Sequence, residues 1–141
     1  MNEQRKLLSI DGGGIRGVLA LEILASLERE LAEALDVPRA EFRLSDFFDY
    51  VAGTSTGALI AACLARGMSV AEIMEFYDKD GRRMFDGRLV KILRSLWQTG
   101  SRFHTTPLEV KLQEMLGKDT TLEPGHLKCH LLAVTRNHTT D

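Results

Sequence analysis

Residues 53–57 read Gly-Thr-Ser-Thr-Gly and carry Ser55 between Gly53 and Gly57. A Gly-x-Ser-x-Gly pentapeptide presents its serine on a sharp turn from a strand to a helix, with the hydroxyl exposed for nucleophilic attack. The two glycines are needed because strand and helix approach so closely that side chains at both positions would collide. The pentapeptide therefore predicts a nucleophilic serine.

A second glycine-rich segment, residues 11–17, reads Asp-Gly-Gly-Gly-Ile-Arg-Gly and follows a short apolar stretch. The backbone N–H groups of successive glycines can hold a developing negative charge. The helix expected after Ser55 adds the partial positive charge of its N-terminus. We interpret the segment as an oxyanion site for Ser55, made by Gly12, Gly13, Gly14 and Arg16.

The same glycine run also matches two nucleotide-binding patterns. Residues 12–17 fit Gly-x-Gly-x-x-Gly after a strand and before a helix, which is the fingerprint of dinucleotide-binding folds. The acidic residue expected about 20 positions further on is missing, since Asp36 falls in a helix-ending turn. Asp-Gly-Gly-Gly is also similar to the phosphate loop of actin-like sugar kinases, but there a β-hairpin follows and here a helix does. Nucleotide binding stays open as a less favoured alternative.

A general base for Ser55 is not evident from these motifs. A Ser-His-Asp arrangement needs a histidine that meets the serine in space. The four candidates are His104, His126, His130 and His138. One of them is predicted in a strand and the others in loops, and we favour structural or solvated roles for all four.

The elements that must position these groups follow from the apolar pattern. Strands are predicted at 6–10, 50–52 and 128–135, the last of them buried, and a capped turn at 45–48. Helices are predicted at 18–35, 57–65, 69–79, 88–97 and 106–116, and Ser69 with Glu72 predicts a capping box at the start of the third. The first helix has leucine or isoleucine at three- and four-residue spacing, at Leu19, Ile23, Leu24, Leu27, Leu31 and Leu35. This alternation predicts an α/β domain with a mostly parallel sheet flanked by helices.

Composition sets broad limits on the function. The 141 residues are 44% hydrophobic and 27% charged, which suits one ordinary domain with a core. A net charge of -2 gives no reason to expect nucleic-acid binding. Cys63 and Cys129 lack metal-ligand spacing and are expected to be buried thiols. Without a leader-like or membrane-spanning stretch, we expect a cytoplasmic protein. Parallel sheets are usually continued and covered on both faces, and this chain stops just past its last predicted strand, so we expect a fold that is incomplete at its C-terminus.

Residues 88–97 form a basic amphipathic pattern with apolar residues on one side. Such a helix can lie at a membrane interface, with cations in the headgroup region and a tryptophan at its edge. The residues that would make this peripheral contact are Arg88, Lys91, Arg94 and Trp97. A surface helix packed on the core is the other interpretation, and we favour it somewhat.

The two glycine-rich motifs carry a resemblance to the patatin-like phospholipase family. The matching segments are Leu-Ser-Ile-Asp-Gly-Gly-Gly-Ile-Arg-Gly at 8–17 and Asp-Phe-Phe-Asp-Tyr-Val-Ala-Gly-Thr-Ser-Thr-Gly at 46–57. The resemblance extends from Leu7 to about Thr135 and implies a three-layer α/β/α fold. It also implies a phospholipase A-type lipid acyl hydrolase that uses a Ser–Asp dyad and needs no metal or cofactor, with Ser55 as the nucleophile.

The chain departs from this family in one respect. The family's catalytic aspartate lies in an Asp-Gly-Gly or Asp-Gly-Ala motif well after the serine. Asp80 and Asp86 are followed by Gly-Arg, and Asp141 is the last residue. The dyad aspartate is therefore expected outside this chain, and residues 1–141 are interpreted as the N-terminal portion of a single domain, with little turnover alone. A non-catalytic lipid-binding or interaction module is the alternative.

Overall fold

The computed structural model describes residues 4–13, 16–85, 112–123 and 125–134. In these residues a sheet of three parallel strands has the order β1-β2-β3. The strands are β1 (Leu7–Ile10), β2 (Tyr50–Thr54) and β3 (His130–Val134). Leu7 pairs with Tyr50 and Tyr50 with His130, so the three strands begin at the same level. The predicted parallel α/β architecture is confirmed.

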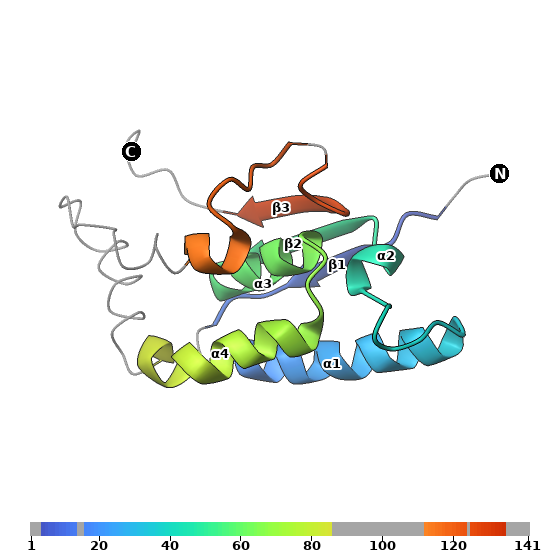
Figure 1. Ribbon diagram of the computed structural model, residues 1–141, viewed down its shortest axis with the longest axis horizontal. Helices are drawn as coiled ribbons and strands as arrows, with labels where there is room; N and C mark the ends of the chain where they lie inside the picture. The colour runs from blue at the N-terminus through green and yellow to red at the C-terminus, as the bar shows by residue number, and fades with distance from the viewer. Residues whose placement is uncertain (1–3, 14–15, 86–111, 124, 135–141) are drawn as a thin grey trace.

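Four labelled helices connect these strands (Figure 1). They are α1 (Arg16–Ala34), α2 (Leu44–Phe47), α3 (Thr56–Ala65) and α4 (Val70–Phe85), and residues 112–116 are also helical. The predicted helices at 18–35 and 57–65 are confirmed, and α4 continues past its predicted end at residue 79. The predicted helix at 88–97, with its proposed membrane contacts, lies outside the described residues.

Helix α1 buries only part of its row of leucine and isoleucine residues. Leu19 and Ile23 are 64% and 62% exposed. The buried positions are Leu21, Leu24, Glu28 and Ala32, which recur at three- and four-residue spacing. In the row of leucine and isoleucine residues, Leu24 is buried and Leu27 and Leu31 pack partly against the core, so the helix turns only part of this row inward.

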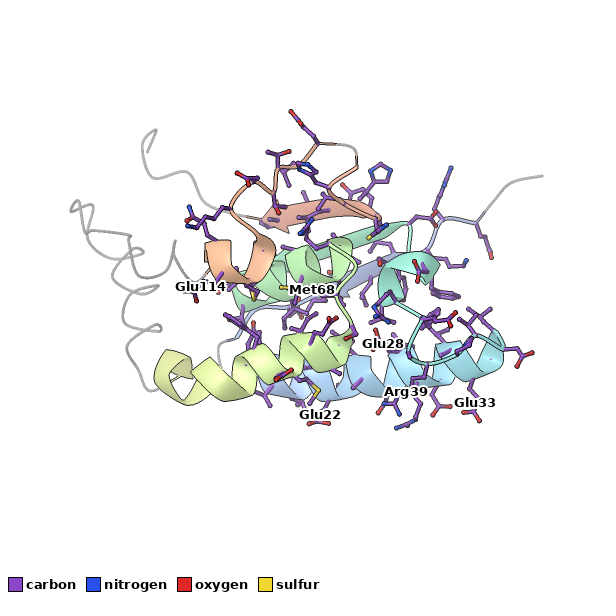
Figure 2. All side chains as sticks on the ribbon, in the orientation of Figure 1. Glu22, Glu28, Glu33, Arg39, Met68 and Glu114 are labelled. Atoms are coloured by element: carbon purple, nitrogen blue, oxygen red, sulfur yellow. The ribbon has the colours of Figure 1, made fainter. Side chains whose placement is uncertain are left out.

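Glu28 joins α1 to the start of α4, and Figure 2 shows it on the inner side of α1, with Glu22 and Glu33 on the outer side. Both oxygens of its carboxylate accept from the Val70 N–H, at 3.3 and 3.1 Å. Burial raises the pKa of Glu28, while the bond from Val70 acts in the opposite direction.

The predicted capping box at the start of α4 is confirmed, since Ser69 N donates to Glu72 Oε2 at 2.7 Å.

The two faces of the sheet differ in the described residues. Val51 and Ile10 are buried on the face against which α3 packs, together with Ile60 and Leu64 of that helix. Strand β3 is exposed over most of its length. Its prediction as a buried strand is wrong for this part of the chain, because β3 is an edge strand here and the face that includes Leu132 is uncovered.

Candidate active site

Ser55 lies between β2 and α3 in a backbone conformation that L-residues rarely adopt, with φ 52° and ψ -124°. Such a conformation costs about 1–3 kcal/mol and persists only where the surroundings impose it. The Ser55 carbonyl accepts from Ala58 N at 3.0 Å and Leu59 N at 3.4 Å, so this residue caps α3 with its backbone. Its hydroxyl makes no capping hydrogen bond, although a serine at this position usually does. The exposed hydroxyl is therefore left available for chemistry.

Gly53 and Gly57 allow this turn by permitting backbone contact. A Cβ on Gly53 would lie 2.3 Å from the carbonyl carbon of Gly57, and a Cβ on Gly57 would lie 2.2 Å from the carbonyl oxygen of Ile10. Real Cβ atoms do not approach backbone so closely, and backbone on all three elements cannot move aside cheaply. The ends of β1 and β2 thus contact the beginning of α3 only because Gly53 and Gly57 lack side chains.

Gly12 rests directly on the Ser55 turn. Its N–H donates to Thr54 Oγ1 at 3.0 Å, and a Cβ on it would lie 2.7 Å from Thr54 O and 2.9 Å from Ser55 Cβ. The Gly12 N–H is therefore committed to Thr54, in contrast to the free oxyanion donor that the sequence predicts. Thr54 emerges as a site residue that no motif position identifies, because the pentapeptide pattern accepts any residue there.

The remaining predicted oxyanion residues are described to different extents. Gly13 is exposed, and its backbone follows Gly12 next to the turn, with φ 155°. Gly14 and the side chain of Arg16 lie outside the described residues. Gly17, at the start of α1, approaches Thr56, since a Cβ there would lie 2.9 Å from Thr56 Cγ2. The structure thus gathers the glycine run, the Ser55 turn and the beginnings of α1 and α3 at one place.

The beginning of α3 makes this place electropositive. The first N–H groups of a helix have no acceptor within the helix, and they carry a partial positive charge that favours an anion. In α3 these groups belong to the residues immediately after Ser55, and the helix has 10 residues. An oxyanion next to the Ser55 hydroxyl would meet these groups and the backbone of the glycine run.

The described histidines lie away from Ser55. His130 begins β3 level with Tyr50 and stacks on its ring, with 5.7 Å between centroids. Five residues of strand, about 16 Å, separate that level from Ser55. His126 is held in a loop, where its Nδ1 accepts from Thr121 N at 3.0 Å. His104, His138, Asp86 and Asp141 lie outside the described residues, as does the side chain of Asp80.

Other features of the described residues bear on a cofactor or membrane anchor. No cluster of three His, Cys, Asp or Glu side chains that could hold a metal ion occurs in them. Cys63 and Cys129 are free thiols, and burial raises the pKa of Cys63 to about 12, so it stays protonated. None of the helices in this part of the chain is both long and apolar enough to cross a membrane.

The chain is similar in sequence to known proteins. A family model described as Patatin-like phospholipase matches residues 8–135. A "cGAMP-activated phospholipase" of Vibrio cholerae is 30% identical over 99% of this chain and 40% of its own length. "Patatin-like protein 1" of Oryza sativa subsp. indica is 42% identical over 79% of this chain and 28% of its own. "Intracellular phospholipase A2" of Caenorhabditis elegans is 34% identical over 91% of this chain and 10% of its own. The chain spans 40% or less of the length of these relatives.

Proposed function

The chain belongs to the patatin-like phospholipase family, and on that premise we propose that it carries the nucleophile and the oxyanion site of a serine lipid acyl hydrolase. The observation that carries the proposal is the backbone of Ser55, with φ 52° and ψ -124° between β2 and α3. A strained strand-to-helix turn with an exposed, uncapped hydroxyl suits a nucleophile and has no evident structural advantage.

The reaction assigned to this site is the transfer of a fatty-acyl group to Ser55. The Ser55 hydroxyl oxygen attacks the ester carbonyl, its proton passes to a general base, and the carbonyl oxygen becomes negatively charged. Collapse of this intermediate expels the alcohol, which takes up a proton, and leaves an acyl-serine. Water then attacks the acyl-serine, releases the fatty acid and restores the hydroxyl. The base is the dyad aspartate that the resemblance implies, outside residues 1–141.

The oxyanion is assigned to the N–H groups of Gly13 and Gly14 together with the N-terminus of α3. Gly12 and Thr54 position this loop, because the bond between Gly12 N and Thr54 Oγ1 holds the glycine run against Ser55. Arg16 stays a proposed source of positive charge near the site. Residues 1–141 are then the N-terminal portion of one domain, with little turnover expected from them alone.

The substrate class is proposed from the family and from the names of the relatives. We assign phospholipids or related acyl lipids, processed at the cytoplasmic face of a membrane. Peripheral contact through the basic segment at 88–97 is the alternative to a helix packed on the core. Replacement of Arg88, Lys91 and Arg94 by glutamate tests that contact. Co-sedimentation of the full-length protein with anionic vesicles that this change leaves unaltered would remove it from the proposal.

A fluorophosphonate tests the nucleophile, since it reacts with activated serines. Full-length protein is expected to be labelled, and Ser55→Ala is expected to lose both labelling and acyl hydrolysis. Ser9→Ala, which removes an exposed hydroxyl on β1, is the matched control and keeps both. Labelling that persists in Ser55→Ala, or its absence from an active wild-type protein, would refute the assignment.

A further inference from the structure

A hollow of about 610 Å³ lies beside the C-terminal half of α3, between that helix, residues 112–122 and β3. Its volume falls within the range of small-molecule pockets, about 300–1,000 Å³. Half of its lining residues are aliphatic, and two are cations, Arg66 and Lys118. The others are Gln113, Gly117, Thr120 and Thr121. The aliphatic residues are Ala62, Leu112, Leu116, Leu122, Leu127 and Leu131.

The hollow is separate from the candidate active site. Ala62 and Arg66 follow Ser55 by seven and eleven residues, which is about 10 and 16 Å along a helix. Leu131 pairs with Val51, near the beginning of β2, whereas Ser55 follows the end of that strand. None of the described residues that line the hollow belongs to the glycine run or to the Ser55 turn.

The lining presents apolar surface to water. Leu122 is 78% exposed, which is high for a leucine that faces a concave surface. Leu116, Leu127 and Leu131 pack against the core while one side of each contributes to the hollow. An acyl chain would cover this surface, whereas a polar ligand would lose its hydration against aliphatic groups that cannot replace it.

The two cations on the lining favour a ligand that also carries a negative charge. Arg66 Nη1 donates to His126 O at 3.3 Å, and a guanidinium has five N–H donors in all. In the described part of the chain, the ion pairs involve neither Arg66 nor Lys118. Gly117 brings its loop close to the guanidinium, since a Cβ on Gly117 would lie 3.6 Å from Arg66 Nη2. Because both cations line the same hollow, a carboxylate bound in it would meet positive charge that no ion pair of the described residues neutralises.

We propose that this hollow binds one long-chain fatty acid, with its chain along the leucines and its carboxylate at Arg66 and Lys118. A single apolar hollow with cations on its lining complements a single-chain anionic amphiphile. The proposal draws on the proposed function only for the source of the ligand, because a fatty acid is the product of acyl hydrolysis. Binding itself needs no reaction at Ser55.

The experiment measures fatty-acid binding to the full-length Ser55→Ala protein, in which no acyl transfer can occur. Titration with the fluorescent fatty acid cis-parinaric acid is expected to saturate, and oleate is expected to displace it. Methyl oleate, which lacks the charge, is expected to compete about tenfold less well. The variant Arg66→Gln/Lys118→Gln should weaken binding about tenfold or more, because two charge-assisted contacts are lost. Arg29→Gln/Arg39→Gln removes the same charge from exposed positions elsewhere and should leave binding unchanged.

A second variant and a labelling step locate the ligand. Ala62→Trp fills the hollow from α3 and should abolish the binding, while an unchanged melting temperature shows that the protein still folds. A diazirine-bearing fatty acid should label peptides that contain residues 56–66 and 112–131. Absence of saturable binding, as expected if another segment of the longer protein fills the hollow, overturns the proposal. Labelling elsewhere, or binding that both variants leave intact, overturns it as well.

The two proposals fail separately. If fluorophosphonate does not label Ser55 while fatty acid still binds the hollow, the hydrolase assignment fails and the fatty-acid site stands. If Ser55 is labelled and the hollow does not bind, the hydrolase assignment stands and the fatty-acid site fails.

Discussion

The two ends of α3 are built in opposite ways. At its N-terminus, backbone meets backbone: Gly57 touches the end of β1, Gly53 touches Gly57, and Gly12 touches the Ser55 turn. At its C-terminus, the helix lines an open hollow with the side chains of Ala62 and Arg66. One helix therefore has a rigid polar end and an adaptable apolar end.

Substitutions are tolerated differently at the two ends of α3. Contacts between backbone atoms cannot be repacked, because no rotamer change relieves them, whereas side chains around an open hollow can move. A reacting group must be held in one geometry, and the strained Ser55 backbone needs that rigidity. A site for a flexible acyl chain has no such requirement.

The largest expected effect is that of Gly57→Ala. The new Cβ would lie 2.2 Å from the carbonyl oxygen of Ile10, so β1 and α3 must separate. We expect the free energy of unfolding of the full-length protein in urea to fall by about 3 kcal/mol or more, in the range of severe overpacking. Gly125→Ala is the control: its φ is also positive, at +100°, but no atom lies within 4 Å of its Cβ. It should cost only about 1–2 kcal/mol, and equal losses would contradict the contrast in packing.

Thr54→Val has the next largest effect, on activity more than on stability. It removes the oxygen that accepts from Gly12 N, and so frees the glycine run from the Ser55 turn. We expect kcat of the full-length enzyme to fall about tenfold, with KM little changed, because a small displacement of oxyanion donors weakens their stabilisation of the intermediate. Thr54→Ser keeps the hydroxyl and should restore most of kcat. Equal activity of the valine and serine variants would rule out this positioning role.

Glu28→Gln tests a polar contact that belongs to neither end of α3. The amide oxygen can still accept from Val70 N, so stability should stay within about 1.5 kcal/mol of wild type. Burial raises the pKa of Glu28 in the folded protein. Its favourable contribution to the free energy of unfolding is therefore complete at pH values below the pKa of glutamate in the unfolded chain. That contribution is lost as pH rises through the raised folded pKa.

The Gln variant should therefore gain stability relative to wild type between those two pKa values, as measured by urea unfolding from pH 4 to pH 7. Glu30→Gln, on the exposed side of α1, is the control for a general charge effect. A relative gain of the same size in Glu30→Gln would show that burial of Glu28 is not the cause.

Leu122→Ser has the smallest expected effect on folding. Its side chain is 78% exposed, so the free energy of unfolding should change by less than about 0.5 kcal/mol. Since Leu122 lines the hollow at the C-terminal end of α3, the same variant should weaken cis-parinaric acid binding several-fold. A large loss of stability would show that Leu122 packs against the core.

Local patterns in the sequence predicted the element types well. The capping box at Ser69 and Glu72 forms as expected, because its partners are three residues apart. Gly67 ends α3 with φ +85°, and Gly67 N donates to Leu64 O at 2.8 Å, as a helix-ending glycine should. These interactions are completed within a few residues, so the tertiary fold has little influence on them.

Interactions between distant segments were predicted less well. The apolar periodicity of α1 fits more than one stripe, and the contact with Val70, 42 residues away, selects the one that contains Glu28. The exposure of β3 depends on what covers the sheet, and a run of apolar residues carries no such information. The contact between Gly12 and Thr54 likewise joins residues 42 positions apart.

The amino-acid sequence alone establishes the chemical groups at Ser55, the strand-to-helix turn that holds it, and the family to which the chain belongs, because these depend on residue types at short spacing. The folded chain is needed to see that Gly12 N donates to Thr54, that α3 has one rigid and one open end, and that two cations border an apolar hollow. Each of these depends on the approach of segments far apart in the chain, which packing fixes and local sequence does not.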